Sequence, residues 1–181
     1  FNQNNIDPAD EATINAAVDN VKITIEYKDG EQQVILNGEN VTSLLRTEAT
    51  GNMASKTSKY KAVRSKLVDL QRELAAAENV VMDGRDIGTC VLPNAQLKIF
   101  LTASVQVRAK RRYDELVEKG ECCDLAEIEK DISERDYRDM HREIAPLKAA
   151  EDAVMLDSSE LNIDEVVEAI YEYAKKAGLE A

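Results

Sequence analysis

The sequence predicts an α/β protein with a parallel sheet and a small antiparallel unit ahead of it. Short apolar segments at 80–82, 97–101 and 153–156 are typical of buried strands, and helical patterns separate or follow them. Strands that alternate with helices in this way form parallel sheets. Residues 22–36 instead alternate between apolar and polar types around a DG pair and before an NG pair, which indicates an antiparallel hairpin.

Helix signals occupy the other intervals. An Asp-Pro start predicts a helix over 7–20, and apolar residues recur at steps of three and four over 58–78. Further helices are predicted over 104–119 and 124–143, each beginning with a residue suited to an N-cap. The last helix begins at Asn162, with a glutamate three residues later in the pattern of a capping box.

The composition narrows the class of protein. A chain of 181 residues has room for one domain, or for one domain carrying an insertion, and an apolar share of 44% permits a packed core. No run approaches the ~20 apolar residues of a membrane span, and the first ten residues lack a signal-peptide pattern. A net charge of −12 argues against a nucleic-acid binder, so an anionic ligand needs a local basic pocket.

Cysteine and histidine exclude further kinds of chemistry. Cys90, Cys122 and Cys123 form no CxxC pair, so we expect no zinc site, and a reducing cytoplasm fits this usage best. His141 is the only histidine in the chain, which rules out any mechanism that needs two. We interpret it as a solvated helix residue.

The segment DGRDIGT at 83–89 is the most informative part of the chain. It follows the strand predicted at 80–82, and open α/β sheets bind ligands beyond the carboxyl ends of their strands. Its two glycines leave room for a close neighbour. Asp83, Arg85 and Asp86 suit a ligand with a phosphate, a metal ion and polar ring edges. The alternative is a structural ion pair that caps a turn.

The helix predicted over 124–143 changes character along one face. An apolar stripe that includes Ile132 continues, at the same helical spacing, into Arg135, Asp139 and Arg142. Unpaired buried charge costs several kcal/mol, so these side chains either pair or hold an anion, for which arginine is well suited. The alternative is an exposed helix end with an Arg135–Asp139 pair worth ~0.3–0.5 kcal/mol.

Two further groups of polar side chains are candidates for ligand contacts. Arg108, Arg111 and Arg112 lie in a basic run that would neutralise a polyphosphate, or that is a solvated face balanced by nearby acids. Ser55 and Arg64 follow the hairpin, where a substrate-binding insertion would meet the core. The alternative is that Ser55 and Arg64 are ordinary surface residues without a role in binding.

Four segments together resemble the bacterial cytidylate kinases: DGRDIGT at 83–89, RAKRR at 108–112, ERDYRDMHREIAPLK at 134–148 and LDSS at 156–159. Their order and spacing match that family from about residue 21 to the C-terminus. The resemblance implies the fold of a P-loop nucleoside-monophosphate kinase, with helices on both faces of the parallel sheet, an antiparallel CMP-binding insertion and a helical lid. It implies transfer of the ATP γ-phosphate to CMP or dCMP with Mg²⁺. We expect a monomer that binds neither nucleic acid nor membrane.

The resemblance also implies a division of the chain. We expect a core helix at 1–20, the CMP-binding insertion and following helix at 21–78, core at 79–103, lid and substrate helices at 104–142, and core again at 143–181.

Carried over residue by residue, the resemblance assigns a role to each candidate. Contacts to CMP are implied for Ser55 and Asp86 at the cytosine amino group, Arg64 at the ring edge, Arg85 and Arg142 at the phosphate, and Arg135 and Asp139 at the ribose hydroxyls. Asp83 would orient Mg²⁺ through water, with no direct protein ligand, and Arg108, Arg111 and Arg112 would be lid residues that face ATP. Asp83, Arg85 and Arg142 are the catalytic candidates.

One part of the family pattern does not occur. The phosphate loop GxxxxGK[ST] is not found in the 181 residues, and Phe1 corresponds to a position about forty residues into the pattern. We therefore expect an incomplete kinase of weak activity and lowered stability. Alternatives are a kinase for UMP or another nucleoside monophosphate, a nucleotide-binding module without catalysis, and a structural domain whose motifs are relics.

Overall fold

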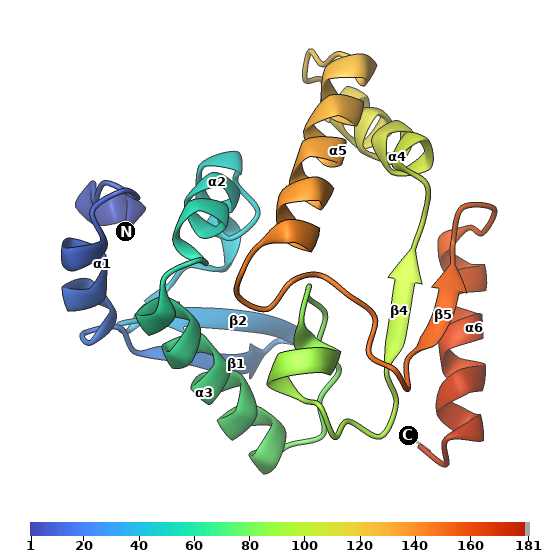
Figure 1. Ribbon diagram of the computed structural model, residues 1–181, viewed down its shortest axis with the longest axis horizontal. Helices are drawn as coiled ribbons and strands as arrows, with labels where there is room; N and C mark the ends of the chain where they lie inside the picture. The colour runs from blue at the N-terminus through green and yellow to red at the C-terminus, as the bar shows by residue number, and fades with distance from the viewer. Residues whose placement is uncertain (180–181) are drawn as a thin grey trace. The chain divides into compact units, whose positions relative to one another are not determined.

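A computed structural model describes residues 1–179, apart from the side chain of Glu48, and the chain divides into two compact units. The N-terminal unit is Phe1–Val80 and the C-terminal unit is Val81–Ala181 (Figure 1). No helix in the part that the structure describes is both long and apolar enough to cross a bilayer.

The N-terminal unit combines a small sheet with helices. Its elements are α1 (Glu11–Val18), β1 (Ile23–Lys28), β2 (Glu31–Leu36), β3 (Glu39–Asn40), α2 (Glu48–Thr57) and α3 (Lys61–Ala77), with 3₁₀ turns at Asn2–Asn4 and Thr42–Leu44.

The predicted hairpin is confirmed as a three-stranded antiparallel sheet in the order β1-β2-β3. β1 and β2 pair from Ile23 opposite Leu36 to Lys28 opposite Glu31. The two residues of the DG pair between them have φ values of 56° and 81°, as a two-residue turn that matches the strand twist requires. The NG pair behaves in the same way between β2 and β3, with φ values of 51° and 89°.

The core of the N-terminal unit lies between α1 and α3. Ile14 and Val18 of α1 pack with Val63 of α3 and with Tyr60, which precedes it. The Tyr60 hydroxyl donates to the Pro8 carbonyl oxygen at 2.8 Å, so the one polar atom of this buried ring is satisfied.

The first helix begins later than the Asp-Pro start predicts. The Asp7 carboxylate accepts a hydrogen bond from the Ala9 amide, which closes a turn. Asp10 then accepts from the Thr13 amide at 3.1 Å and is the N-cap of α1. The helix predicted over 58–78 likewise begins at Lys61.

The C-terminal unit contains a parallel pair of strands. Its elements are a π-helical turn (Ile87–Val91), β4 (Ile99–Thr102), α4 (Val105–Glu118), α5 (Leu125–His141), β5 (Val154–Asp157) and α6 (Ile163–Lys176). β4 and β5 pair in parallel from Ile99 opposite Val154 to Thr102 opposite Asp157, which confirms the predicted direction. α4 and α5 lie side by side beyond the end of β4 (Figure 1).

The predicted helix starts in this unit are also confirmed. Ser104 and Asp124 are the N-caps of α4 and α5, and each accepts a hydrogen bond from the amide three residues ahead. Asn162 and Glu165 form a complete capping box at the start of α6.

The strand predicted at 80–82 is not formed. This segment has irregular backbone and Val81 is fully exposed. A strand exists only through hydrogen bonds to a neighbour, and no strand within residues 1–179 pairs with it. Its apolar composition alone therefore does not produce a strand, and the parallel sheet has two strands in the described chain.

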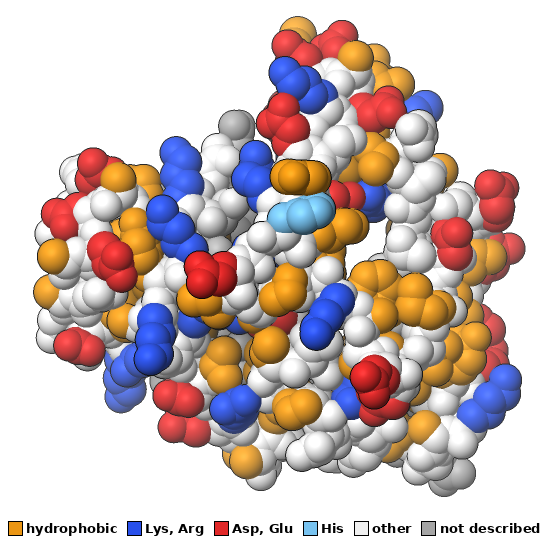
Figure 2. All heavy atoms as spheres, viewed as in Figure 1, with side chains coloured by type: hydrophobic (Ala, Val, Ile, Leu, Met, Phe, Trp, Pro, Cys, Tyr) orange, Lys and Arg blue, Asp and Glu red, His pale blue; other side chains and the backbone are white. Residues whose placement is uncertain are grey.

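Charged side chains of both signs are interspersed on the face that Figure 2 displays. The acidic residues therefore do not form one continuous acidic surface on this face. A site for an anion has to be sought in local groups of arginine.

Candidate functional site

The first four residues of the 83–89 motif, 83–86, are called the DGRD segment, and they turn sharply before the π-helical turn. A Cβ atom on Gly84 would lie 2.8 Å from the Cγ1 atom of Ile87, so the close neighbour that this glycine admits is the chain itself. The carbonyl oxygen of Asp86 then accepts from the Cys90 amide at 2.8 Å. π-Helical turns are often found at functional sites, and this one directly follows Arg85 and Asp86.

Asp139 of α5 is held by two arginines. The Nε atom of Arg85 donates to its carboxylate at 3.0 Å, and the Nε atom of Arg135 lies 3.9 Å from the same oxygen. The Asp139 side chain is 18% exposed, whereas Arg135 is 59% exposed. One half-buried carboxylate therefore joins the DGRD segment to α5, and a second cation lies at its outer side.

Asp86 and Arg142 make a second link between the same two segments. An Nη atom of Arg142 forms an ion pair with the Asp86 carboxylate at 3.5 Å, without a hydrogen bond. The Nε atom of Arg142 donates to the carbonyl oxygen of Ala145. That buried Nη atom has no hydrogen-bond acceptor in the described chain, and a buried donor without one costs about 1–3 kcal/mol. An anionic ligand would supply the acceptor.

Five of the predicted residues thus lie together in the C-terminal unit. This arginine–aspartate cluster consists of Arg85, Asp86, Arg135, Asp139 and Arg142. It combines three guanidinium groups with two carboxylates, a donor and acceptor set that suits a phosphate beside sugar hydroxyls.

The three arginines predicted to face ATP have protein partners. Arg108 binds the Asp136 carboxylate through both Nη atoms, and Arg111 donates to the carbonyl oxygens of the turn after β5. Arg112 pairs with Glu115 one turn along α4. Among the contacts in the described chain, Arg112 pairs within α4 itself, whereas Arg108 and Arg111 bind groups outside that helix. Its role toward ATP, like those of Arg108 and Arg111, stays a prediction.

Comparison with known proteins decides the family. The family model described as Cytidylate kinase matches residues 1–176. The chain belongs to the cytidylate kinase family. It is similar to the cytidylate kinases of Lactobacillus johnsonii (50% identical over 173 residues, 96% of this chain and 75% of the relative) and Lactobacillus gasseri (51% identical, the same shares). The cytidylate kinase of Caldicellulosiruptor bescii is 48% identical over 170 residues, or 94% of this chain and 75% of the relative. Members of the cytidylate kinase family are phosphotransferases.

Two of the residues predicted to contact CMP lie in the N-terminal unit. Ser55 lies on α2, where its carbonyl oxygen accepts from the Ser58 hydroxyl, and Arg64 lies on α3. The contribution of Ser55 and Arg64 to the site stays a prediction.

Asp83 is the residue predicted to orient Mg²⁺ through water. Its carboxylate is exposed at the start of the DGRD segment. Within residues 1–179, no three or more His, Cys, Asp or Glu side chains are grouped so that they could hold a metal ion. The role of Asp83 toward Mg²⁺ stays a prediction.

Sequence reasoning missed Asp136. The inward stripe of α5 runs through Ile128 and Ile132 to Asp136 and Asp139, while Arg135 is turned outward. Helical spacing from Ile132 allows either residue 135 or residue 136 to lie on the inward face. Only the contact with Arg108 on α4 selects residue 136, and nothing in the sequence alone distinguishes Asp136 from the other acidic residues of α5.

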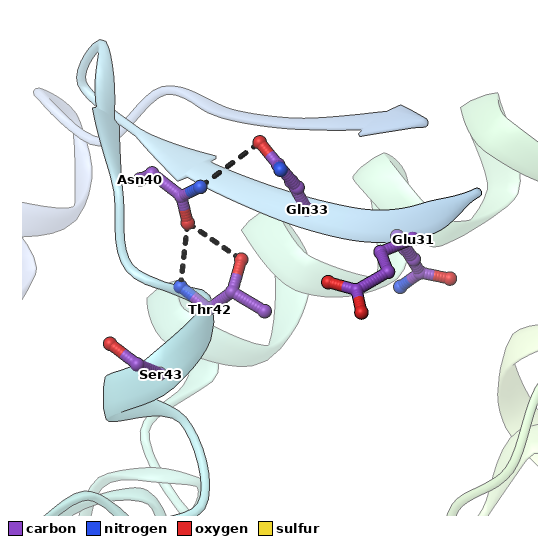
Figure 3. A pocket seen from close by; sticks show the side chains of 6 residues that line it. Glu31, Gln33, Asn40, Thr42 and Ser43 are labelled. Carbon is purple, nitrogen blue, oxygen red and sulfur yellow. Dashed lines mark hydrogen bonds between the residues drawn. The ribbon is translucent and has the colours of Figure 1, made fainter. Parts of the chain in front are cut away.

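A separate hollow of about 340 Å³ lies on the antiparallel sheet (Figure 3). The side-chain Oδ1 atom of Asn40 accepts from both the amide and the hydroxyl of Thr42, and its Nδ2 atom donates to the side-chain oxygen of Gln33. These polar atoms satisfy one another.

Proposed function

We propose that this chain transfers the γ-phosphate of ATP to CMP or dCMP, giving ADP and CDP or dCDP, and that the arginine–aspartate cluster holds the pyrimidine nucleotide. The observation that carries the proposal is the convergence of the DGRD segment and the end of α5 on shared carboxylates. Family membership supports the reaction, and the cluster supports the location.

The charges of the cluster suit an exchange of partners on binding. In the structure the guanidinium of Arg85 rests on Asp139, and that of Arg142 lies near Asp86. The CMP phosphate would take over these cations, since arginine binds phosphate in a bidentate manner. The released carboxylates would then accept hydrogen bonds from the ribose hydroxyls at Asp139 and from the cytosine amino group at Asp86.

The reaction requires positioning more than covalent help. The attacking atom is an oxygen of the CMP phosphate, which is already ionised at neutral pH, so no protein base is needed. Arg85 and Arg142 would fix that phosphate in line with ATP. Mg²⁺ bound to the ATP phosphates supplies charge neutralisation, and the exposed carboxylate of Asp83 would hold it through water.

The finer architecture belongs to the same proposal. We infer that α4 and α5, within 104–142, act as the lid and substrate helices, that 1–20, 79–103 and 143–181 form the core with helices on both sheet faces, and that 21–78 carries the CMP-binding insertion. The antiparallel sheet at 23–40 is the element that supports the cytidine assignment over a kinase for UMP or AMP. Ser55 and Arg64 would then read the cytosine ring.

Competition among nucleotides tests the proposed function. We expect the chain to bind CMP and dCMP more tightly than UMP or AMP in calorimetric titrations, and to label CMP first when all four share one pool of ATP labelled at the γ-phosphate. Ser55→Ala should narrow the difference between CMP and UMP, while Ser43→Ala, on the polar hollow, should leave it unchanged. Preference for AMP, or equal binding of all four nucleotides, would contradict the proposal.

A further inference from the structure

One guanidinium ties α5 to the end of β4. The Nε atom of Arg108 donates to the carbonyl oxygen of Ala103, immediately after β4, at 3.0 Å. Its two Nη atoms donate to the two carboxylate oxygens of Asp136 on α5, at 3.1 and 2.5 Å. All three nitrogens of Arg108 are therefore used inside the protein.

The Arg108–Asp136 pair is better placed than a surface ion pair. The Asp136 side chain is 16% exposed. The contact is bidentate, with two parallel hydrogen bonds, so it fixes the relative orientation of the two groups as well as their distance. By contrast, Lys110 and Asp114 form an exposed pair within α4 alone. Exposed pairs of this kind contribute little to stability, so Lys110 offers a matched comparison on the same helix.

A second arginine anchors α4 itself. Arg111 donates to the carbonyl oxygens of Ser158 and Leu161, at 2.6 and 3.0 Å, in the turn that follows β5. The hydroxyl of Ser158 donates in turn to the Thr102 carbonyl at the end of β4. α4 is thus fixed to the carboxyl edge of both strands, and Arg108 extends that anchoring to α5.

Asp136 and Asp139 are one helical step apart on the inward side of α5. A shift of α5 would therefore move Asp139 relative to Arg85 on the DGRD segment. Misplacement of a reacting group by about 1 Å can reduce a rate roughly a hundredfold. The position of α5 is thus expected to set the geometry of the whole arginine–aspartate cluster.

We propose that Arg108 and Asp136 are positioning residues that hold α5 in register for CMP. This inference rests on the proposed function, because it names what aligns that site. It assigns Arg108 a role toward the CMP side through Asp136, in place of a direct contact with ATP.

The test is a double-mutant cycle read by nucleotide binding. Arg108→Ala and Asp136→Ala should each weaken CMP binding about tenfold, and the double variant should lose little more than either single one, since the pair acts as a unit. ATP affinity should not change. Arg108→Lys should recover only part of the loss, because lysine cannot form the bidentate contact, and Lys110→Ala should bind CMP like the parent chain.

A second readout needs no ligand. Amide hydrogen exchange over residues 136–142 should accelerate equally in Arg108→Ala and Asp136→Ala, with the far-ultraviolet circular dichroism retained, and should not accelerate in Lys110→Ala. Unchanged exchange in both variants, additive losses of CMP affinity, or a loss of ATP affinity in Arg108→Ala would overturn the inference. A parent chain that binds no CMP, yet shows the exchange pattern, would instead contradict the proposed function alone.

Discussion

The Nε atom of Arg85 lies 3.0 Å from a carboxylate oxygen of Asp139, which is 54 residues further along the chain. This bond joins the turn after residue 83 to the last turns of α5. It shows that a carboxylate assigned to the ribose and an arginine assigned to the phosphate are neighbours.

Asp139→Ala should weaken CMP binding, because the ribose hydroxyls lose a charged acceptor. Hydrogen bonds to charged groups are worth about 1.5–3 kcal/mol, which corresponds to roughly ten- to a hundredfold in affinity. The same variant should bind 2′,3′-dideoxy-CMP about as well as the parent chain does, because that ligand has no hydroxyl to lose. Calorimetry with both ligands checks this, and equal losses for the two would contradict the ribose assignment.

Arg142→Ala should affect the phosphate and not the nucleoside. Its buried Nη atom has no hydrogen-bond acceptor among residues 1–179. If the CMP phosphate supplies one, the variant should lose roughly ten- to a hundredfold in CMP affinity. Binding of cytidine, which has no phosphate, should stay unchanged. Arg138→Ala is the matched control, since Arg138 is exposed on α5 and pairs with Glu134. A comparable loss in Arg138→Ala would show a general charge effect instead.

Lys98 and Asp152 predict an asymmetric effect on stability. The Lys98 side chain is 8% exposed and Asp152 is 65% exposed. Asp152→Ala leaves the buried ammonium with the Pro93 carbonyl and should lower the melting temperature by several degrees. Lys98→Met should lower it less, because Asp152 returns to water. Thermal unfolding of the two variants measures the two melting temperatures. A larger decrease for Lys98→Met than for Asp152→Ala would contradict the prediction and show that the ion pair itself is the main contribution to stability.

Glu115 predicts a dependence on acid pH. Hydrogen bonds from Lys119 and then Arg112 lower the pKa of Glu115 from 4.5 to about 2. Because the folded-state pKa is depressed, the stabilisation is present above about pH 4.5 and is lost as the pH falls toward 2. Carboxyl-resolved NMR titration should place the midpoint of Glu115 near 2, and Lys119→Gln should raise it toward 4.5. A midpoint near 4.5 in the parent chain would contradict the contact.

Local signals predicted much of the fold because their causes are local. The DG and NG pairs specify backbone with positive φ, and the caps at Ser104, Asp124 and Asn162 satisfy amides within one helical turn. These effects depend on three or four neighbouring residues, so the sequence contains all the information they need.

The errors arose where a distant partner decides. The segment at 80–82 has the composition of a strand, but strand formation requires a neighbouring ladder, and none is present in the described residues. On α5 the helical period allows either Arg135 or Asp136 to face inward, and the contact with Arg108 on another helix selects Asp136. The residues of the cluster were each predicted from the family motif, and their proximity depends on contacts between distant segments that the sequence does not specify.

The most direct test of a single nucleotide site is a CMP titration followed through the side-chain Nε–Hε NMR signals of Arg85, Arg135 and Arg142. If the cluster is one site, the three signals shift together and saturate at one shared dissociation constant, while the signal of Arg138 stays in place. Signals that do not move, or that follow separate saturation curves, would contradict the account.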